Sequence, residues 1–177
     1  MKRNQLIKLL EEYIPSQEEI IYKHDMLSFI KENENCFDRE LEIGHITGSA
    51  WLLNKAGDKA LLMHHKKLDR WFQPGGHADG DHDILAVAIK EAQEESGINA
   101  IEPVSRSIFD IDIHQIPANS KDVAHFHYDV RFLLQVVSDE DFQQNEESNE
   151  LRWVDINAIP TKERSVLRMF SKWHRPL

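Results

Sequence analysis

The sequence has little cysteine and no long apolar run. Its single cysteine, Cys36, excludes a disulfide within the chain, so we expect no core that depends on such bonds. The longest uninterrupted apolar run, Ile84 to Ile89, is far shorter than the roughly 20 residues that cross a bilayer. The chain starts with charged residues rather than with the apolar core of a signal peptide. We therefore expect a cytoplasmic protein without a membrane segment.

Basic residues are also few. The sequence has 21 lysines and arginines and 31 aspartates and glutamates, which gives a net charge of −10 with neutral histidines. A broad cationic surface for nucleic acid or anionic lipid is therefore not expected, and a phosphate-bearing ligand would need cations placed locally. With 177 residues, the chain is long enough for one domain with a sizeable core.

Apolar spacing predicts helices at both ends of the chain and a sheet between them. Pro15 separates two N-terminal helices, and Ser16 to Glu19 fits a capping box that begins the second one. A third helix is predicted over 84–95 with Gly97 as its stop, and Thr161 is the predicted cap of a last helix. The predicted strands are, in chain order, 46–53, 59–64, 107–116, 124–137 and 151–154. Residues 55–58 are predicted to form a hairpin turn between the first two strands.

The predicted strands 107–116 and 124–137 carry an unusual polar face. A simple hairpin between them sets Asp110 opposite Asp129, Asp112 opposite His127, and His114 opposite His125. A face that is simply solvated is one interpretation, and two others are favoured over it. The face lines a substrate cleft, with His125, His127 and Arg131 as ligand contacts and Arg131 on a phosphate, or the pairs are structural hydrogen bonds. A transition-metal site at His125 and His127 is disfavoured, because no third ligand has a recognisable spacing.

The segment from Gly75 to Ile98 is the most informative part of the sequence. Glu91, Glu94 and Glu95 stand at helical spacing, so their carboxylates share one face and repel one another. A hard divalent cation relieves such repulsion, and Mg²⁺ is commonly held by carboxylates together with substrate phosphates. An acidic, solvated helix face is the alternative interpretation. The preceding Gly75 and Gly76 allow close backbone approach and can present amides to an anion, which favours a site.

Residues 76–98 resemble the Nudix box, whose pattern is Gly, five residues, Glu, seven residues, then Arg-Glu-apolar-x-Glu-Glu-x-Gly-apolar. Starting at Gly76, the residues from Lys90 to Ile98 fall in register with its second half. His82 and Lys90 depart from the usual Glu and Arg, which in the family are mainly supporting residues. Lysine keeps the charge without the planar fork of arginine. The favoured interpretation is that the His82 side chain only fills space, and a proton-dependent contact is the alternative.

The resemblance implies an α+β fold, a Nudix-like α/β/α sandwich with a mixed sheet over 41–177, preceded by a helical extension over 1–40. It also implies hydrolysis of a diphosphate linkage in a nucleoside-diphosphate-like small molecule, a pyrophosphohydrolase that uses Mg²⁺ or Mn²⁺. Glu91, Glu94 and Glu95 match the family's metal ligands. From the acidic loop, Glu150 is a further candidate ligand and Glu147 a candidate base. Among the predicted catalytic residues Glu91, Glu94 and Glu147, the first choice of base is Glu94.

Other functions stay open at this point. A Nudix-fold module that binds a ligand without catalysis is conceivable from the departures at His82 and Lys90. An isomerase acting on an isoprenoid diphosphate would need a cysteine in the cleft, and Cys36 lies outside the recognisable domain. The expected partner is a small-molecule diphosphate, nucleic acid is not expected, and a homodimer through the N-terminal helices is a further hypothesis.

Overall fold

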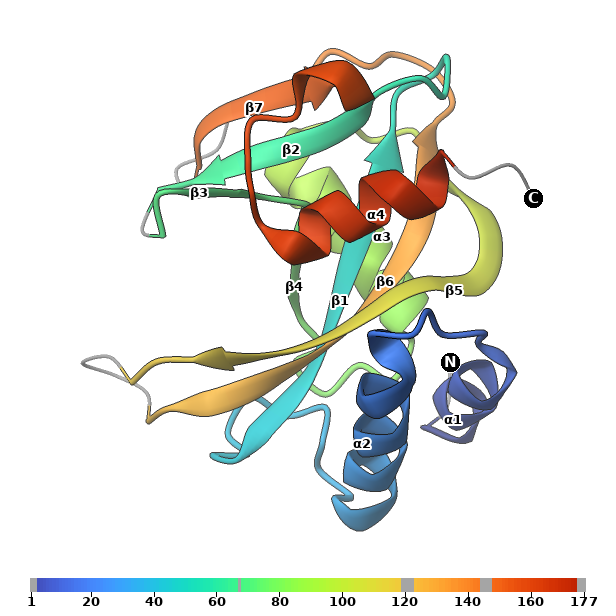
Figure 1. The fold of residues 1–177 in the computed structure, drawn as a ribbon, viewed down its shortest axis with the longest axis vertical. Helices are drawn as coiled ribbons and strands as arrows, with labels where there is room; N and C mark the ends of the chain where they lie inside the picture. Colours follow the sequence, from blue (N-terminus) through green and yellow to red (C-terminus); the bar gives the residue numbers. More distant parts are fainter. Residues whose placement is uncertain (1–2, 67, 119–122, 144–147, 175–177) are drawn as a thin grey trace.

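We describe the fold from a computed structural model that covers residues 3–66, 68–118, 123–143 and 148–174 (Figure 1). Four α-helices and seven strands lie within these residues, and none of the helices is long and apolar enough to cross a membrane. The helices are α1 (Arg3–Glu12), α2 (Glu19–Glu32), α3 (Ile84–Ser96) and α4 (Arg164–Trp173). The strands are β1 (Gly44–Leu53), β2 (Ala60–His65), β3 (Arg70–Phe72), β4 (Gly75–His77), β5 (Ile101–Ile116), β6 (His125–Val136) and β7 (Ser148–Val154).

The two N-terminal helices form as predicted on either side of Pro15. Half of the predicted capping box is present: Glu19 Oε2 accepts a hydrogen bond from the Ser16 N–H at 2.8 Å, whereas the Ser16 hydroxyl has no hydrogen-bond partner. Leu10 of α1 and Met26 of α2 are fully buried in the same apolar cluster as the sheet. The helices therefore share the core, and a domain boundary near residue 40 stays a prediction.

β1 is the central strand of a mixed sheet with the order β3-β2-β1-β6-β5. It pairs with β6 in parallel along its whole length, from Gly44 beside Phe126 to Leu53 beside Gln135. It also pairs with β2 and β4 in antiparallel, and β7 pairs with β2. The hairpin predicted around 55–58 is confirmed, since Leu53 pairs with Ala60.

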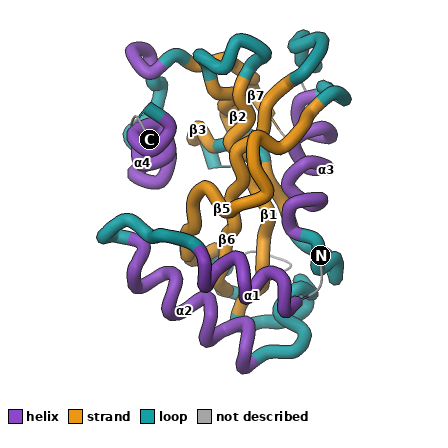
Figure 2. Tube along the Cα trace, turned by 90° about the vertical axis from the view of Figure 1, so that its right-hand side faces the viewer, coloured by secondary structure: helices purple, strands orange, loops and turns teal. Residues whose placement is uncertain are grey.

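Helices cover both faces of this sheet (Figure 2). Ile46 and Leu52 of β1 join Ala88 of α3 in one apolar cluster, while Trp51 of β1 packs against Phe170 of α4 on the other face, with ring centroids 4.7 Å apart. Alternate residues of one strand point to opposite faces, which is why β1 feeds both clusters. The predicted α/β/α sandwich is confirmed.

The predicted register of β5 and β6 is wrong by two residues. Asp112 pairs with Asp129 and His114 pairs with His127, while Asp110 pairs with Arg131. A shift of two residues keeps every side chain on its own face, so the alternation of polar and apolar residues cannot separate the two registers. The polar face itself is therefore as predicted, although its pairs are different.

The last helix begins later than predicted. α4 starts at Arg164, and the Thr161 hydroxyl instead accepts a hydrogen bond from the Glu163 N–H at 3.2 Å, within the turn before the helix. Because α4 begins three residues after Thr161, Thr161 is not the helix cap. Pro160 directly precedes this turn. Side-chain turns of this kind compete with capping, and the sequence pattern does not distinguish them.

Beneath α4 lies a cluster of buried charges. Lys172 Nζ lies 2.5 Å from Glu19 Oε1 and 2.7 Å from Asp110 Oδ2, and the Tyr13 hydroxyl donates to Glu19 at 2.6 Å. Burial alone would raise the pKa of Glu19, but the hydrogen bonds from Lys172, Ser16 and Tyr13 outweigh it and lower the pKa to about 2. This cluster joins α2, β5 and α4.

The first prediction concerns Glu19→Gln. Because its carboxylate is buried and paired, the substitution should reduce the free energy of unfolding at pH 7 by about 3–5 kcal/mol. A pKa lowered in the folded state stabilises the fold above its ordinary value of 4.5 and loses that effect as the pH falls towards 2. The difference between wild type and variant should therefore shrink over this range in urea titrations.

Glu18→Gln is the matched control for that comparison, because the Glu18 side chain is 53% exposed and its ion pairs lie at the surface. It should change stability by less than about 1 kcal/mol. A Glu19→Gln difference that stayed constant from pH 7 to pH 2.5 would contradict the charge-based explanation.

Candidate active site

Helix α3 carries the three predicted carboxylates on one side. Asp83 begins the helix by accepting a hydrogen bond from the Ala86 N–H at 3.2 Å. Gly97 ends it with a φ of 74°, a left-handed conformation that glycine adopts without strain. Between them, Glu91, Glu94 and Glu95 occupy the spacing that places side chains on a common face.

The three carboxylates differ in exposure. Glu95 is 6% exposed, and its Oε2 accepts a hydrogen bond from the Gly75 N–H at 3.0 Å. The Glu91 side chain is 17% exposed and that of Glu94 is 58% exposed. Lys90 Nζ lies 3.9 Å from Glu91 Oε1 and 3.7 Å from Glu94 Oε2, so it offsets part of their repulsion. The group thus runs from a buried, anchored carboxylate to one that faces solvent.

Strand β4 reaches these carboxylates because Gly75 and Gly76 have no side chains. A Cβ at residue 76 would lie 2.4 Å from the carboxyl carbon of Glu91, and one at residue 75 would lie 2.1 Å from Ser49 Oγ. Both distances are shorter than any normal contact between these atoms. The predicted closeness of the two glycines to the acidic helix is confirmed, and their contact with substrate stays a prediction.

Arg131 lies on the other face of the sheet, fully surrounded by carboxylates. Its Nε lies 2.7 Å from Asp129 Oδ2, its Nη1 3.0 Å from Asp110 Oδ1 and its Nη2 3.4 Å from Asp112 Oδ2. Its side chain is 2% exposed. Burial opposes the charge, but Asp129, Asp112 and Asp110 outweigh it and raise the pKa of Arg131. This geometry favours the structural-pairing interpretation, and the phosphate contact stays a prediction.

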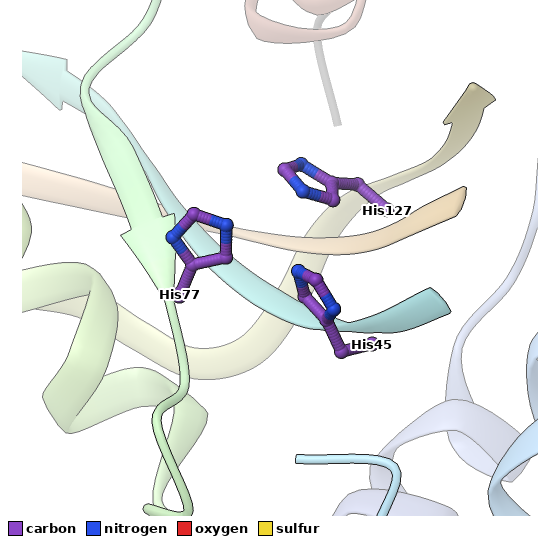
Figure 3. A group of neighbouring side chains, drawn as sticks. All are labelled: His45, His77 and His127. Carbon is purple, nitrogen blue, oxygen red and sulfur yellow. The ribbon is translucent and has the colours of Figure 1, made fainter. Parts of the chain in front are cut away.

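Three histidines converge from three strands beside this polar face: His45 of β1, His77 of β4 and His127 of β6 (Figure 3). Their ring nitrogens lie within 4.8 Å of one another. His45 is 2% exposed, and neither of its ring nitrogens has a hydrogen-bond partner. Burial and the neighbouring histidines lower the pKa of His45 to about 4 and that of His127 to about 2. Both are therefore neutral at pH 7.

Sequence reasoning found His125 and His127 but missed His45 and His77. It lacked a third ligand because it paired only β5 with β6. The parallel pairing of β1 with β6 sets His45 beside His127, and the pairing of β4 with β1 sets His77 beside Thr47. Such long-range pairings leave no spacing signal in the sequence. The only available sign was that His45 opens a predicted strand and His77 ends the glycine turn.

A family model described as the NUDIX domain matches residues 45–174, which is more than half of the chain. The chain belongs to the Nudix family. The resemblance of residues 76–98 to the Nudix box is thereby confirmed, with the helix, the glycine turn and the carboxylates of the box in the arrangement described above.

Known Nudix proteins resemble this chain at different levels. The Nudix hydrolase YvcI of Bacillus subtilis, itself uncharacterized, is 30% identical over 104 residues, which are 58% of this chain and 61% of that protein. The structure of a MutT protein from Methanosarcina mazei has a TM-score of 0.58 at 20% identity, over 75% of this chain and 94% of its own. A UDP-X diphosphatase has a TM-score of 0.54 at 15% identity over 98% of this chain and 95% of its own. The two structures share the fold.

The departures from the Nudix box have different surroundings. The exposed ring of His82 lies 4.4 Å from that of Phe37, between centroids, which favours packing as its role. Lys90, in the place of the usual arginine, contacts the carboxylates as described. The fold therefore keeps a cation next to Glu91 and Glu94, while His82, in the place of the usual glutamate, lies against an aromatic ring.

The predicted ligands from the acidic loop are less well defined. Glu147 lies outside the described residues. The Glu150 side chain, on β7, is 48% exposed and accepts a hydrogen bond from Arg152 Nη2 at 2.6 Å. The roles predicted for both glutamates stay predictions.

The environment of Cys36 speaks against the isomerase alternative. The residue is fully buried between α2 and β1, and burial raises the pKa of its thiol to about 11. A thiol in this state is a poor nucleophile or acid–base group at neutral pH.

The second prediction compares Gly75→Ala with Gly76→Ala. The new methyl group at residue 76 meets only the end of the flexible Glu91 side chain, so this variant should keep its melting temperature and bind Mn²⁺ more weakly. At residue 75 the methyl group meets the Ser49 side chain and its Cα at 2.9 Å, so the strands must separate and the melting temperature should fall. Thermal unfolding and Mn²⁺ titration measure the two effects. Equal loss of stability in both variants would contradict this assignment.

The third prediction tests the two interpretations of Arg131. Arg131→Gln leaves three buried aspartates without their shared cation, so the free energy of unfolding should fall by about 3–5 kcal/mol in urea titrations. The exposed Arg106→Gln is the control and should change it by less than about 0.5 kcal/mol. Unchanged stability of Arg131→Gln would contradict structural pairing and leave ligand binding as the role of Arg131.

Proposed function

We propose that the protein is a divalent-metal-dependent Nudix hydrolase that cleaves the diphosphate linkage of a nucleoside-diphosphate-like small molecule. The observation that carries this proposal is the set of three carboxylates on one face of α3, with the Gly75–Gly76 turn fitted against two of them. Family membership supports a pyrophosphohydrolase.

The donor atoms of this site suit a hard divalent cation. Glu91, Glu94 and Glu95 offer only oxygen ligands, and Lys90 Nζ within 4 Å of two of them indicates that this face stabilises positive charge. These three glutamates would hold Mg²⁺ or Mn²⁺, with Glu150 as a proposed further ligand. When bound, such an ion neutralises phosphate oxygens and lowers the pKa of a coordinated water.

The different surroundings of the glutamates suggest a division of roles. Glu95 is held in position by the Gly75 N–H, and the Glu91 carboxylate lies against the backbone of Gly76. Glu94 is the most exposed of the three and faces the water that hydrolysis consumes. We therefore infer that Glu94 takes the proton, with Glu147 as the second choice. Their titrations are coupled, so the pH profile will report on the group as a whole.

The substrate class is proposed from charge and similarity. An acidic chain with a net charge of −10 suits a small ligand better than a nucleic acid. The likeness to a UDP-X diphosphatase supports a nucleoside diphosphate joined to another group. Gly75 and Gly76 stay candidate phosphate contacts, although the Gly75 N–H already donates to Glu95 Oε2. His125, His127 and Arg131 stay candidate contacts, although the polar face lies on the side of the sheet away from α3.

The fourth prediction is a metal-dependent activity that Glu94→Gln removes. Nucleotide sugars and dinucleoside polyphosphates should be assayed with Mg²⁺ and with Mn²⁺ by the phosphate that an added phosphatase releases from the products. Nucleoside triphosphates should be assayed with the same ions by the pyrophosphate released, without the phosphatase. Glu94→Gln and Glu95→Gln should lower kcat/KM by about 10²–10⁴-fold while the melting temperature stays within a few degrees. Glu102→Gln, an exposed glutamate on β5, is the matched control and should keep full activity.

Each possible result decides between functions. Turnover that survives both glutamate substitutions would contradict the proposed mechanism. Binding of a nucleotide in calorimetry without turnover of any compound would favour the ligand-binding alternative. In that case Lys90 would serve as the permanent counter-charge of the carboxylates.

A further inference from the structure

We propose that His45, His77 and His127 form a second metal site, for a zinc-type first-row transition ion, separate from the carboxylates of α3. Imidazole nitrogens suit such ions, whereas Mg²⁺ prefers oxygen ligands. The three residues come from β1, β4 and β6, so the ion would join three strands at the start of β1 (Figure 3). This inference does not depend on the proposed hydrolytic activity.

The strongest evidence is His45. Its side chain is almost fully buried, and both of its ring nitrogens lack a hydrogen-bond partner. Buried polar groups in proteins are nearly always hydrogen-bonded, and an exception needs an explanation. His45 lies with its ring centroid 4.9 Å from that of His77 and 4.9 Å from that of His127. A metal ion between the three rings would satisfy the lone pair of His45.

The distances fit after small side-chain movements. Two nitrogens that bind one zinc ion in a tetrahedral arrangement lie about 3.4 Å apart, given bonds of about 2.0–2.1 Å. In the structure the three ring nitrogens lie within 4.8 Å of one another. His45 and His127 are direct register partners, so the sheet already holds their Cα atoms side by side. Side-chain rotation is therefore enough, and no strand needs to move.

His125 is placed to position His127. Its Nδ1 lies 2.8 Å from the Val123 carbonyl oxygen and must donate to it, so its Nε2 carries a lone pair. That Nε2 lies 3.3 Å from His127 Nε2, and a hydrogen bond between them places the proton on His127 Nε2 and leaves the Nδ1 lone pair of His127 for the ion. Metal-binding histidines in proteins are regularly held by such an outer hydrogen bond, and its loss typically costs about 10–100-fold in affinity. We assign His125 as a positioning residue.

The two sites lie on opposite faces of the sheet. Gly76 pairs with Gly48, and a Cβ at Gly48 would touch Val87 of α3. This pair of residues therefore lies on the face of the sheet that α3 and its carboxylates cover. His77 pairs with Thr47, whose hydroxyl donates to Asp129 on the polar face. Three histidines leave a fourth position on a tetrahedral ion, as in catalytic zinc sites. The ligand class expected there is water or an anionic oxygen.

The fifth prediction is tested by titrating metal-free protein with Zn²⁺ in calorimetry, with Mg²⁺ in excess to occupy oxygen ligands. We expect wild type to bind one equivalent of Zn²⁺ tightly. His127→Ala and His77→Ala should lower the Zn²⁺ affinity by more than about 100-fold, which is a larger loss than removal of an outer hydrogen-bond partner causes. Co²⁺ should give the intense visible absorption of a tetrahedral site in wild type only. His125→Ala should bind about 10–100-fold more weakly with unchanged stoichiometry and an unchanged melting temperature.

His24→Ala is the control for unspecific binding, because this histidine lies on α2 with 79% of its side chain exposed. It should bind Zn²⁺ like wild type. His77 is only half-buried, so His77→Ala should fold even where a change at the buried His45 does not. Equal zinc affinity in wild type, His77→Ala and His127→Ala would overturn the proposal, as would wild type without a tight equivalent. Loss of hydrolysis in Glu94→Gln with intact zinc binding would separate this site from the proposed active site.

Discussion

The pairing of β1 with strands on both of its sides is the constraint on which both candidate sites depend. In parallel with β6, β1 carries His45 beside His127 and Ser49 beside Arg131. In antiparallel with β4, it holds the glycine turn against α3. The close packing at Gly48, where a Cβ would lie 2.9 Å from the Ile84 carbonyl oxygen, fixes the start of α3 on this strand. One strand therefore positions the acidic helix and the histidines together.

Three buried or half-buried cations of this acidic chain form ion pairs within the fold. Arg131, Arg168 and Lys172 converge on Asp110, which is fully buried and accepts hydrogen bonds from all three. This cluster ties α4 to the sheet and leaves those cations committed to aspartates. At the carboxylates of α3, Lys90 is the cation that the structure places nearby. Charge neutralisation of a diphosphate by a metal ion is consistent with this distribution, because Lys90 already pairs with Glu91 and Glu94.

Local signals in the sequence predicted the local structure well. The Nudix box, with its glycine turn, its helix and its Gly97 stop, and the hairpin around 55–58 depend on residues close together in the chain. The register of β5 and β6 was missed by two residues, because alternation repeats with that period. The histidine cluster was missed because it depends on pairings between distant segments, at His45 and His127, that leave no local pattern. The sequence therefore predicted the carboxylates of α3 and did not predict the cluster of histidines.

The arrangement of β4 gives the two sites different chemistry within two consecutive residues. Gly76 leaves room for the Glu91 carboxylate where it lies, and His77 presents its ring on the opposite face. The glutamates of the proposed magnesium site lie on one side and the histidines on the other, so under the two proposals a hard ion and a borderline ion would bind apart. His77 and Gly75 belong to the same three-residue strand, and the Gly75 N–H holds Glu95, so β4 contributes to both proposed sites.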